Sequence, residues 1–130
     1  MPSIFTKIIK GDIPWYKIYE DSNYLAFLDI APLSLGHVLV IPKEEIDYIF
    51  DIEAEEYRCL WDFAKKVAKG MKKVLECKRI GIAVIGLEVS HAHIHLVPIK
   101  NVDDINFSRP KMSFSKEEME KTAILIREAI

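Results

Sequence analysis

The chain has 130 residues, of which 50% are hydrophobic and 29% are charged, and its formal net charge at pH 7 is −2. This length and balance predict one globular domain over residues 1–130. The small net charge gives no reason to expect nucleic acid or an anionic membrane as a partner. No apolar run approaches the roughly 20 residues of a membrane span, and the N-terminus does not resemble a signal peptide.

The two cysteines, Cys59 and Cys77, are expected on one long helix. About 27 Å of helical rise would then separate them, which is too far for a disulfide within the chain. Unpaired thiols favour a reducing compartment, so we expect a cytoplasmic protein.

The predicted elements follow from hydrophobic periodicity and from turn residues. Helical spacing of apolar residues predicts a short helix within residues 1–11 and a long helix over 51–77. A capping box at Ser115–Glu118 predicts a final helix over 115–130. Alternating or continuous apolar runs predict strands over 15–19, 24–28, 37–42, 79–85 and 93–98, and residues 101–112 read as a loop. Together these elements predict an α+β fold, with an antiparallel five-stranded sheet crossed by the long helix.

Three of the four histidines alternate with apolar residues in the segment 89–98. On a strand, His91, His93 and His95 would share one face, while Ala92, Ile94 and Leu96 would occupy the other face. Each imidazole has two nitrogens that need partners, so three in a row are poor core residues. The pattern therefore favours a histidine face that opens onto a cleft.

Two other interpretations of the histidines remain open. They could form a solvated strand face without function, although such faces more often carry Lys, Thr or Glu. They could also bind a metal such as zinc, although a third ligand from the same strand is geometrically awkward.

The segment 91–97, His-Ala-His-Ile-His-Leu-Val, resembles the His-φ-His-φ-His-φ-φ motif of the histidine-triad family of nucleotide hydrolases and nucleotidyl transferases. Residues 21–32 are similar to the family's Glu-Asp…Ala-Phe-x-Asp-Ile-x-Pro stretch, and residues 36–42 to its Gly-His-x-Leu-Val-Ile-Pro stretch. The resemblance covers about residues 3–98 and leaves 99–130 as a loop followed by the C-terminal helix.

The resemblance implies roles for four histidines. His93 would attack the α-phosphorus of a purine nucleotide adduct, with a backbone carbonyl of its own strand fixing its tautomer. His95 and His37 would hold phosphate oxygens or the leaving atom, and His91 would support the geometry of His93. Water would then release the nucleoside monophosphate. The implied enzyme is a hydrolase of phosphoramidate or phosphoanhydride bonds that needs no cofactor.

The resemblance also implies a nucleotide pocket. Asp29 would accept hydrogen bonds from the ribose hydroxyls, although an aspartate that only ends a strand would look the same in sequence. The expected base-binding side chains are apolar: Phe5, Ile8, Phe27, Ile30, Leu39 and Val89.

The sequence departs from the family pattern in two places. Residues 86–89 form a shorter loop than is usual before the triad, and Glu88 stands where relatives have a hydroxyl that contacts phosphate. Ser3, Thr6 and Glu45 replace the two cysteines and the histidine that complete a structural zinc site with the first triad histidine in many relatives. Hydroxyls are poor zinc ligands beside thiolates, so we predict no structural zinc at these positions.

Family members commonly form homodimers through the long helix and a sheet edge, and we expect the same here. Two other functions stay open: a nucleotide-binding sensor that turns over nothing, and a metal-dependent hydrolase that uses the histidines as ligands.

Overall fold

The computed structural model describes residues 3–13 and 15–130. Its sheet has five strands, all antiparallel, in the order β1-β2-β3-β5-β4. The strands are β1 (Lys17–Glu20), β2 (Tyr24–Leu28), β3 (Val38–Pro42), β4 (Arg79–Ala83) and β5 (Ile94–Ile99). The helices are α1 (Ile4–Ile9), α2 (Ala54–Val74) and α3 (Lys116–Ala129), with short 3-10 turns at Ile49–Asp51 and Val102–Ile105. The predicted α+β fold is thus confirmed.

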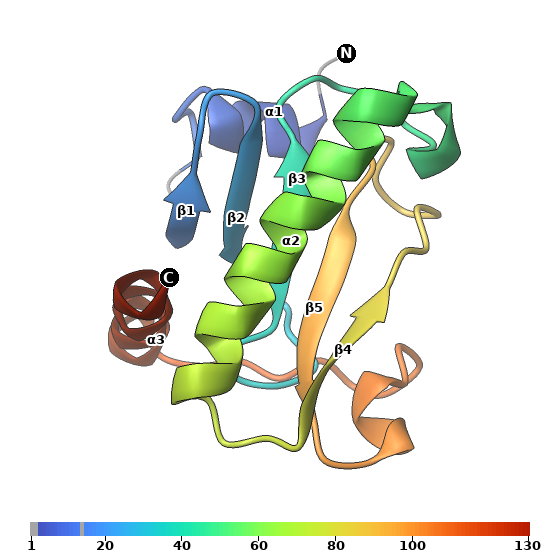
Figure 1. The fold of residues 1–130 in the computed structure, drawn as a ribbon. Coiled ribbons are helices and arrows are strands. Elements are labelled where there is room, and N and C mark those ends of the chain that lie inside the picture. Colours follow the sequence, from blue (N-terminus) through green and yellow to red (C-terminus); the bar gives the residue numbers. More distant parts are fainter. Residues whose placement is uncertain (1–2, 14) are drawn as a thin grey trace.

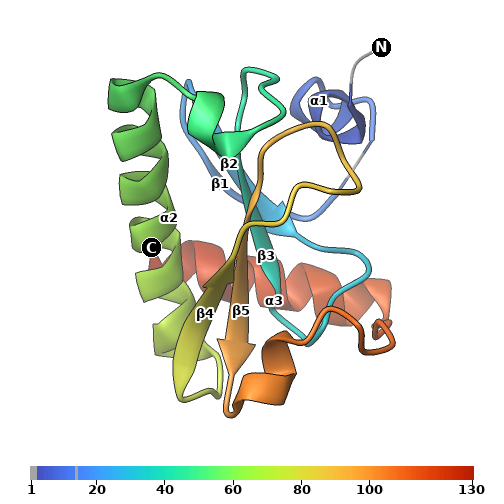
Figure 2. The same ribbon diagram turned by 90° about the vertical axis from the view of Figure 1, so that its right-hand side faces the viewer.

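The two faces of the sheet bury different sets of side chains, because successive residues of a strand point in opposite directions. Figure 2 shows α2 along one face and α1 on the other side. Toward α2, the central strands contribute Ala26, Val40 and Leu96 to the larger core. Toward α1, residues of the opposite parity (Leu25, Phe27, Leu39 and Ile41) pack against Phe5 and Ile8.

The long helix is shorter than the predicted range 51–77. It begins after Glu53, whose carboxylate accepts the backbone N–H groups of Glu55 and Glu56, and it ends at Val74. Leu75 turns to an extended conformation and packs over Gly36, where a Cβ atom would come within 2.7 Å of a Leu75 methyl. Cys77 therefore lies outside the helix. No helix among residues 3–13 and 15–130 is both long and apolar enough to cross a membrane.

The strand before the triad and the triad strand also differ from their predicted ranges. The strand predicted over 79–85 ends at Ala83, and β5 begins only at Ile94, so His91 and His93 precede it. The reason is local pairing: the His91 N–H bonds to the Val89 carbonyl at 2.8 Å, and the Ala92 N–H bonds to the Ile46 carbonyl at 2.7 Å. These two amides are therefore not available to the sheet ladder.

Serine hydroxyls cap the first and the last helix, and only the cap at Ser115 was predicted from the sequence. The Ser3 hydroxyl caps α1 by accepting the Thr6 N–H at 3.1 Å, and the Ser115 hydroxyl caps α3 by accepting the Glu118 N–H at 3.1 Å. Proline disfavours helix in the residue before it, so the sequence also predicts a helix break at Ile13–Pro14, but residue 14 lies outside the described residues. Figure 1 shows α3 beside α2, near the β1 edge of the sheet.

Candidate active site

A hollow of about 260 Å³ lies on the α1 side of the sheet, next to the triad segment. Of the catalytic residues predicted from sequence, His37, His93 and His95 line it, and His91 does not. Of the predicted nucleotide-binding residues, Phe5, Asp29, Leu39 and Val89 line it. The hollow therefore collects side chains from α1, the ends of β2 and β3, and the triad segment.

The three other predicted base contacts lie elsewhere. Ile8 and Phe27 are fully buried behind Phe5 in the small core on this side of the sheet. Ile30 is 48% exposed on the loop after β2 and does not line the hollow. Ile8 and Phe27 can thus support the wall of the hollow but do not form its surface.

The backbone fixes the tautomer of His93. Its Nδ1 lies 2.8 Å from the carbonyl oxygen of His91, which can only accept, so Nδ1 carries the proton. The lone pair of the ring is then on Nε2. The edge of the Phe5 ring packs at 5.0 Å from the His93 ring, centroid to centroid, and restricts its orientation. His93 thus presents an unprotonated nitrogen at the hollow.

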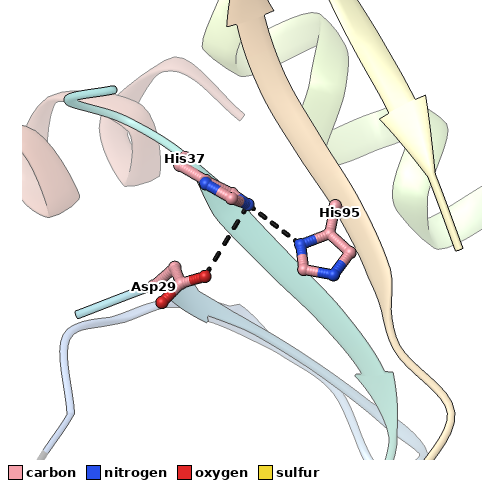
Figure 3. Close-up of side chains that lie close together, drawn as sticks. All are labelled: Asp29, His37 and His95. Carbon is pink, nitrogen blue, oxygen red and sulfur yellow. Dashed lines mark hydrogen bonds and ion pairs between the residues drawn. The ribbon is translucent and has the colours of Figure 1, made fainter. Parts of the chain in front are cut away.

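His37 and His95 form a hydrogen-bonded pair, drawn in Figure 3. The Leu33 N–H donates to His37 Nδ1 at 3.0 Å, so His37 carries its proton on Nε2. That nitrogen lies 3.0 Å from His95 Nδ1, which must accept. His95 therefore carries its own proton on Nε2, the nitrogen that remains for a ligand. One backbone amide thus makes His95 a hydrogen-bond donor.

The same pair is held in the neutral state. The pKa of His37 is lowered to about 4 and that of His95 to about 3, mainly by burial, and the positive charge of Lys111 contributes to both shifts. Phe107 covers the pair, with its ring centroid 4.7 Å from that of His95 and 6.1 Å from that of His37. Near neutral pH neither ring brings a positive charge to the hollow.

His91 is fully buried and both of its ring nitrogens are engaged. Nε2 donates to the Pro42 carbonyl at 2.7 Å, and Nδ1 lies 2.8 Å from the Ser3 hydroxyl, which donates to it. Burial lowers the pKa of this ring. His91 therefore contacts His93 through its backbone carbonyl, and its own side chain is held away from the hollow by two hydrogen bonds.

The positions that carry zinc ligands in many relatives are linked by direct hydrogen bonds here. The Thr6 hydroxyl donates to the Glu45 carboxylate at 2.8 Å, and the Ser3 backbone N–H donates to the same oxygen. Glu45 Oε1 lies 4.0 Å from His91 Nδ1. These bonds hold the pKa of Glu45 well below its ordinary value, so the carboxylate stays charged. The network ties the start of α1 to the triad through direct hydrogen bonds.

Asp29 sits at the end of β2, beside His37. One carboxylate oxygen accepts the Ala31 N–H at 2.9 Å, and the other lies 3.7 Å from His37 Nε2. Burial raises the pKa of Asp29, while the Ala31 bond and Lys111 act in the opposite direction. The second oxygen remains available to a ligand hydroxyl.

Asp29, His37 and His95 also form a candidate metal-ligand set, because one donor atom from each lies within 4.8 Å of the others. Two nitrogens of these residues, His37 Nε2 and His95 Nδ1, already bond to each other. A metal bound between these two nitrogens would have to displace the proton that they share. This set contains neither His91 nor His93, so it does not use the triad as three ligands.

Several residues that line the hollow were not predicted as site residues from the sequence, among them Ala31, Ile85 and Gly86. Phe107 and Lys111 also line it and come from the polar segment that was predicted only as a loop, and Leu87 comes from the short loop before the triad. Glu88, which the sequence placed near phosphate, does line the hollow. An aromatic residue and a lysine within a polar loop were the only signals in the sequence for Phe107 and Lys111.

Comparison with known proteins shows which chains this protein is similar to. The family model described as HIT domain matches residues 10–102. The chain is 38% identical over 122 residues to the adenosine 5'-monophosphoramidase of Schizosaccharomyces pombe, which covers 92% of this chain and 91% of that protein. It is 34% identical over 131 residues to an uncharacterized HIT-like protein of Borreliella burgdorferi, covering 95% of this chain and 94% of that protein.

Solved structures agree with the sequence comparison. A Hit-like protein from Bartonella henselae superposes with a TM-score of 0.84 at 30% identity, over 98% of this chain and 96% of that one. A zinc-bound histidine triad family protein from Mycobacterium smegmatis gives a TM-score of 0.83 at 31% identity, over 97% and 91% of the two chains. The chain therefore belongs to the HIT family.

Proposed function

We propose that the protein hydrolyses phosphoramidate or phosphoanhydride bonds at the α-phosphorus of purine nucleotides, through a covalent intermediate on His93. The observation that supports this most strongly is the His93–His91 hydrogen bond, which leaves a nucleophilic lone pair on Nε2. The relative in S. pombe, named an adenosine 5'-monophosphoramidase, supports the same class of substrate.

In the first step, His93 Nε2 forms a bond to phosphorus and the bond to the leaving nitrogen or oxygen breaks. The developing charge falls on the phosphoryl oxygens and the leaving atom. The His95 Nε2–H can donate to either, because His37 keeps His95 in that tautomer. In the second step, water attacks phosphorus, the bond to His93 breaks, and the nucleoside monophosphate leaves.

The nucleoside would lie along the apolar wall of the hollow. Phe5, Leu39 and Val89 offer an apolar surface to a flat base, and the free oxygen of Asp29 can accept a bond from a ribose hydroxyl. A purine covers more of this surface than a pyrimidine. We therefore expect AMP or GMP to bind more tightly than CMP.

A substrate panel read by nucleotide release tests this function. Wild type should cleave at least one of an AMP phosphoramidate, an ADP-type anhydride and a dinucleoside polyphosphate. His93→Ala should lose at least about a thousandfold in kcat, because the nucleophile is gone. It should still bind AMP, because Phe5, Leu39 and Asp29 remain. Full activity of His93→Ala would contradict the proposal.

The same panel separates the two alternative functions. A sensor would bind AMP and cleave nothing in the panel. A metal-dependent hydrolase using Asp29, His37 and His95 would lose activity with EDTA and regain it with zinc. Activity that EDTA does not change would favour the histidine nucleophile.

We also propose that the protein acts as a homodimer in the cytoplasm, where its free thiols would stay reduced. β4 lies at an edge of the sheet, and exposed apolar side chains continue from it into the next loop. These side chains are Ile82, Val84, Ile85 and Leu87, joined by the exposed aromatic rings of Tyr48 and Phe50. An apolar patch on an open edge strand favours association.

Sedimentation analysis tests the dimer. Ile82→Lys should shift the protein to monomer, because it places a charge in the middle of this apolar edge. Ile124→Lys, at a similarly exposed position on α3, should leave the dimer intact. A wild-type monomer at micromolar concentration would contradict the dimer and leave the proposed reaction unaffected.

A further inference from the structure

The segment 101–112, which we call the strap, begins where the match to the HIT family model ends. Hydrogen bonds and an ion pair within the strap stabilise its conformation. The Asp104 carboxylate accepts the backbone N–H groups of Lys100 and Asn101 at 2.7 and 3.0 Å, and Arg109 pairs with the same side chain. At its far end, the Met112 N–H donates to the Pro32 carbonyl at 2.8 Å. The strap is therefore held at both ends beside the hollow.

The strap brings two side chains to the hollow. Phe107 is half-buried against the rings of His95 and His37. The Lys111 ammonium donates to the Phe107 carbonyl at 3.0 Å and lies 5.2 Å from the centroid of the Phe107 ring. The carbonyl bond and the ring together hold the exposed lysine beside Phe107 at the hollow.

The charges around the hollow give this lysine a particular importance. Among the described residues that line the hollow, Lys111 is the one lysine or arginine, and Asp29 and Glu88 are the carboxylates. The imidazoles of His37 and His95 are neutral near pH 7, because burial lowers the pKa of each. A nucleotide phosphate entering this hollow would otherwise meet two carboxylates and no fixed positive charge.

We propose that Lys111 binds the phosphoryl oxygens of the nucleotide, and that the strap thereby selects phosphorylated over unphosphorylated nucleosides. This inference rests on the proposed nucleotide site, and Lys111 lies beyond the residues 10–102 that the family model matches. The inference also explains how phosphate could bind beside the short 86–89 loop. The positive charge of Lys111 compensates for the negative charge of Glu88, which lines the same hollow.

Calorimetric binding of AMP, adenosine and inorganic pyrophosphate to the full-length protein tests the inference. Lys111→Met should raise the Kd for AMP and pyrophosphate about tenfold, the loss expected for one charge-assisted hydrogen bond. It should leave the Kd for adenosine unchanged. Lys111→Arg, which keeps the charge, should bind AMP within about threefold of wild type. Lys72→Met, which removes an exposed lysine of α2, controls for the loss of overall charge.

The outcomes separate this inference from the proposed function. Equal AMP affinity in wild type and Lys111→Met overturns the role of the lysine, even if the enzyme is active. Equal weakening of AMP and adenosine also overturns it, because it would show a structural effect on the hollow. A wild type that binds neither AMP nor pyrophosphate overturns the inference as well. Loss of turnover in His93→Ala with normal AMP binding would support the proposed function, whatever the result for Lys111→Met.

Discussion

The imidazole of His93 donates its Nδ1 proton to the carbonyl oxygen of His91, two residues earlier, at 2.8 Å. The first and second triad histidines are therefore linked through the backbone, while the side chain of the first is fully buried. The alternating pattern of the motif has a direct use here: the peptide of one histidine fixes the proton on the next. Backbone groups also fix the tautomers of His91 and His37. The Pro42 carbonyl accepts the Nε2 proton of His91, and the Leu33 N–H donates to Nδ1 of His37, which leaves the His37 proton on Nε2.

His37 should act through His95. His37→Leu removes the proton donor to His95 Nδ1, so His95 can adopt the tautomer that no longer donates from Nε2. We expect kcat to fall about 10- to 100-fold, the usual effect of losing a group that orients a reacting side chain. His37→Gln retains an amide N–H near the position of Nε2 and should recover part of this loss. Steady-state kinetics of the two variants provide the test, and equal rates for Leu and Gln would contradict it.

Stability should fall on acidification between about pH 6.5 and pH 4. His37 and His95 have folded pKa values of about 4 and about 3, below the value of 6.5 for an unperturbed histidine. In this window the unfolded chain binds protons that the folded chain does not, so stability is complete above pH 6.5 and is lost as the pH falls. Each ring can contribute at most about 1.4 kcal/mol per pH unit.

Urea unfolding from pH 7 to pH 4 measures this dependence. The His37→Gln/His95→Gln double variant should show a flatter profile than wild type over the same range. Identical slopes for the two proteins would mean that the pair is not held neutral by burial.

The Ser3–Thr6–Glu45 network should be convertible into a zinc site. Side-chain donors at these three positions already surround His91 Nδ1, with Ser3 Oγ 2.8 Å from that nitrogen. Ser3→Cys/Thr6→Cys/Glu45→His should therefore bind one zinc ion per chain and gain thermal stability from it. Wild type should retain no stoichiometric zinc after dialysis.

Elemental analysis and thermal unfolding with and without EDTA check this conversion. A triple variant that binds no zinc would show that the network does not occupy the position of the family's metal site. Stoichiometric zinc in dialysed wild type would contradict the prediction that Ser3, Thr6 and Glu45 form no structural zinc site.

Sequence patterns predicted the elements of this fold well, because its strands and helices carry clear periodicity. The alternation around Ile94 and Leu96 placed one side of the triad strand in the core, as the structure shows. The end of the long helix was wrong by three residues, since it depends on Leu75 packing over Gly36, a contact across the fold. Such a contact leaves no periodic signal.

The site was predictable only where the motif carried it. His37, His93 and His95 line one hollow, but the sequence could not show that His91 turns away to bond Ser3. The position of Lys111 could not be predicted either, because it depends on a backbone bond between the strap and Pro32. A polar loop has no periodicity from which its place over the sheet could be inferred.

The proposed reaction requires that His93 becomes covalently bonded to phosphorus during turnover. Rapid mixing of the enzyme with excess AMP phosphoramidate, alkaline denaturation within milliseconds and intact-mass analysis test it most directly. We expect one nucleoside monophosphate per chain on the peptide that contains His93, and none in His93→Ala. AMP release at the full wild-type rate with no adduct at any time would contradict it.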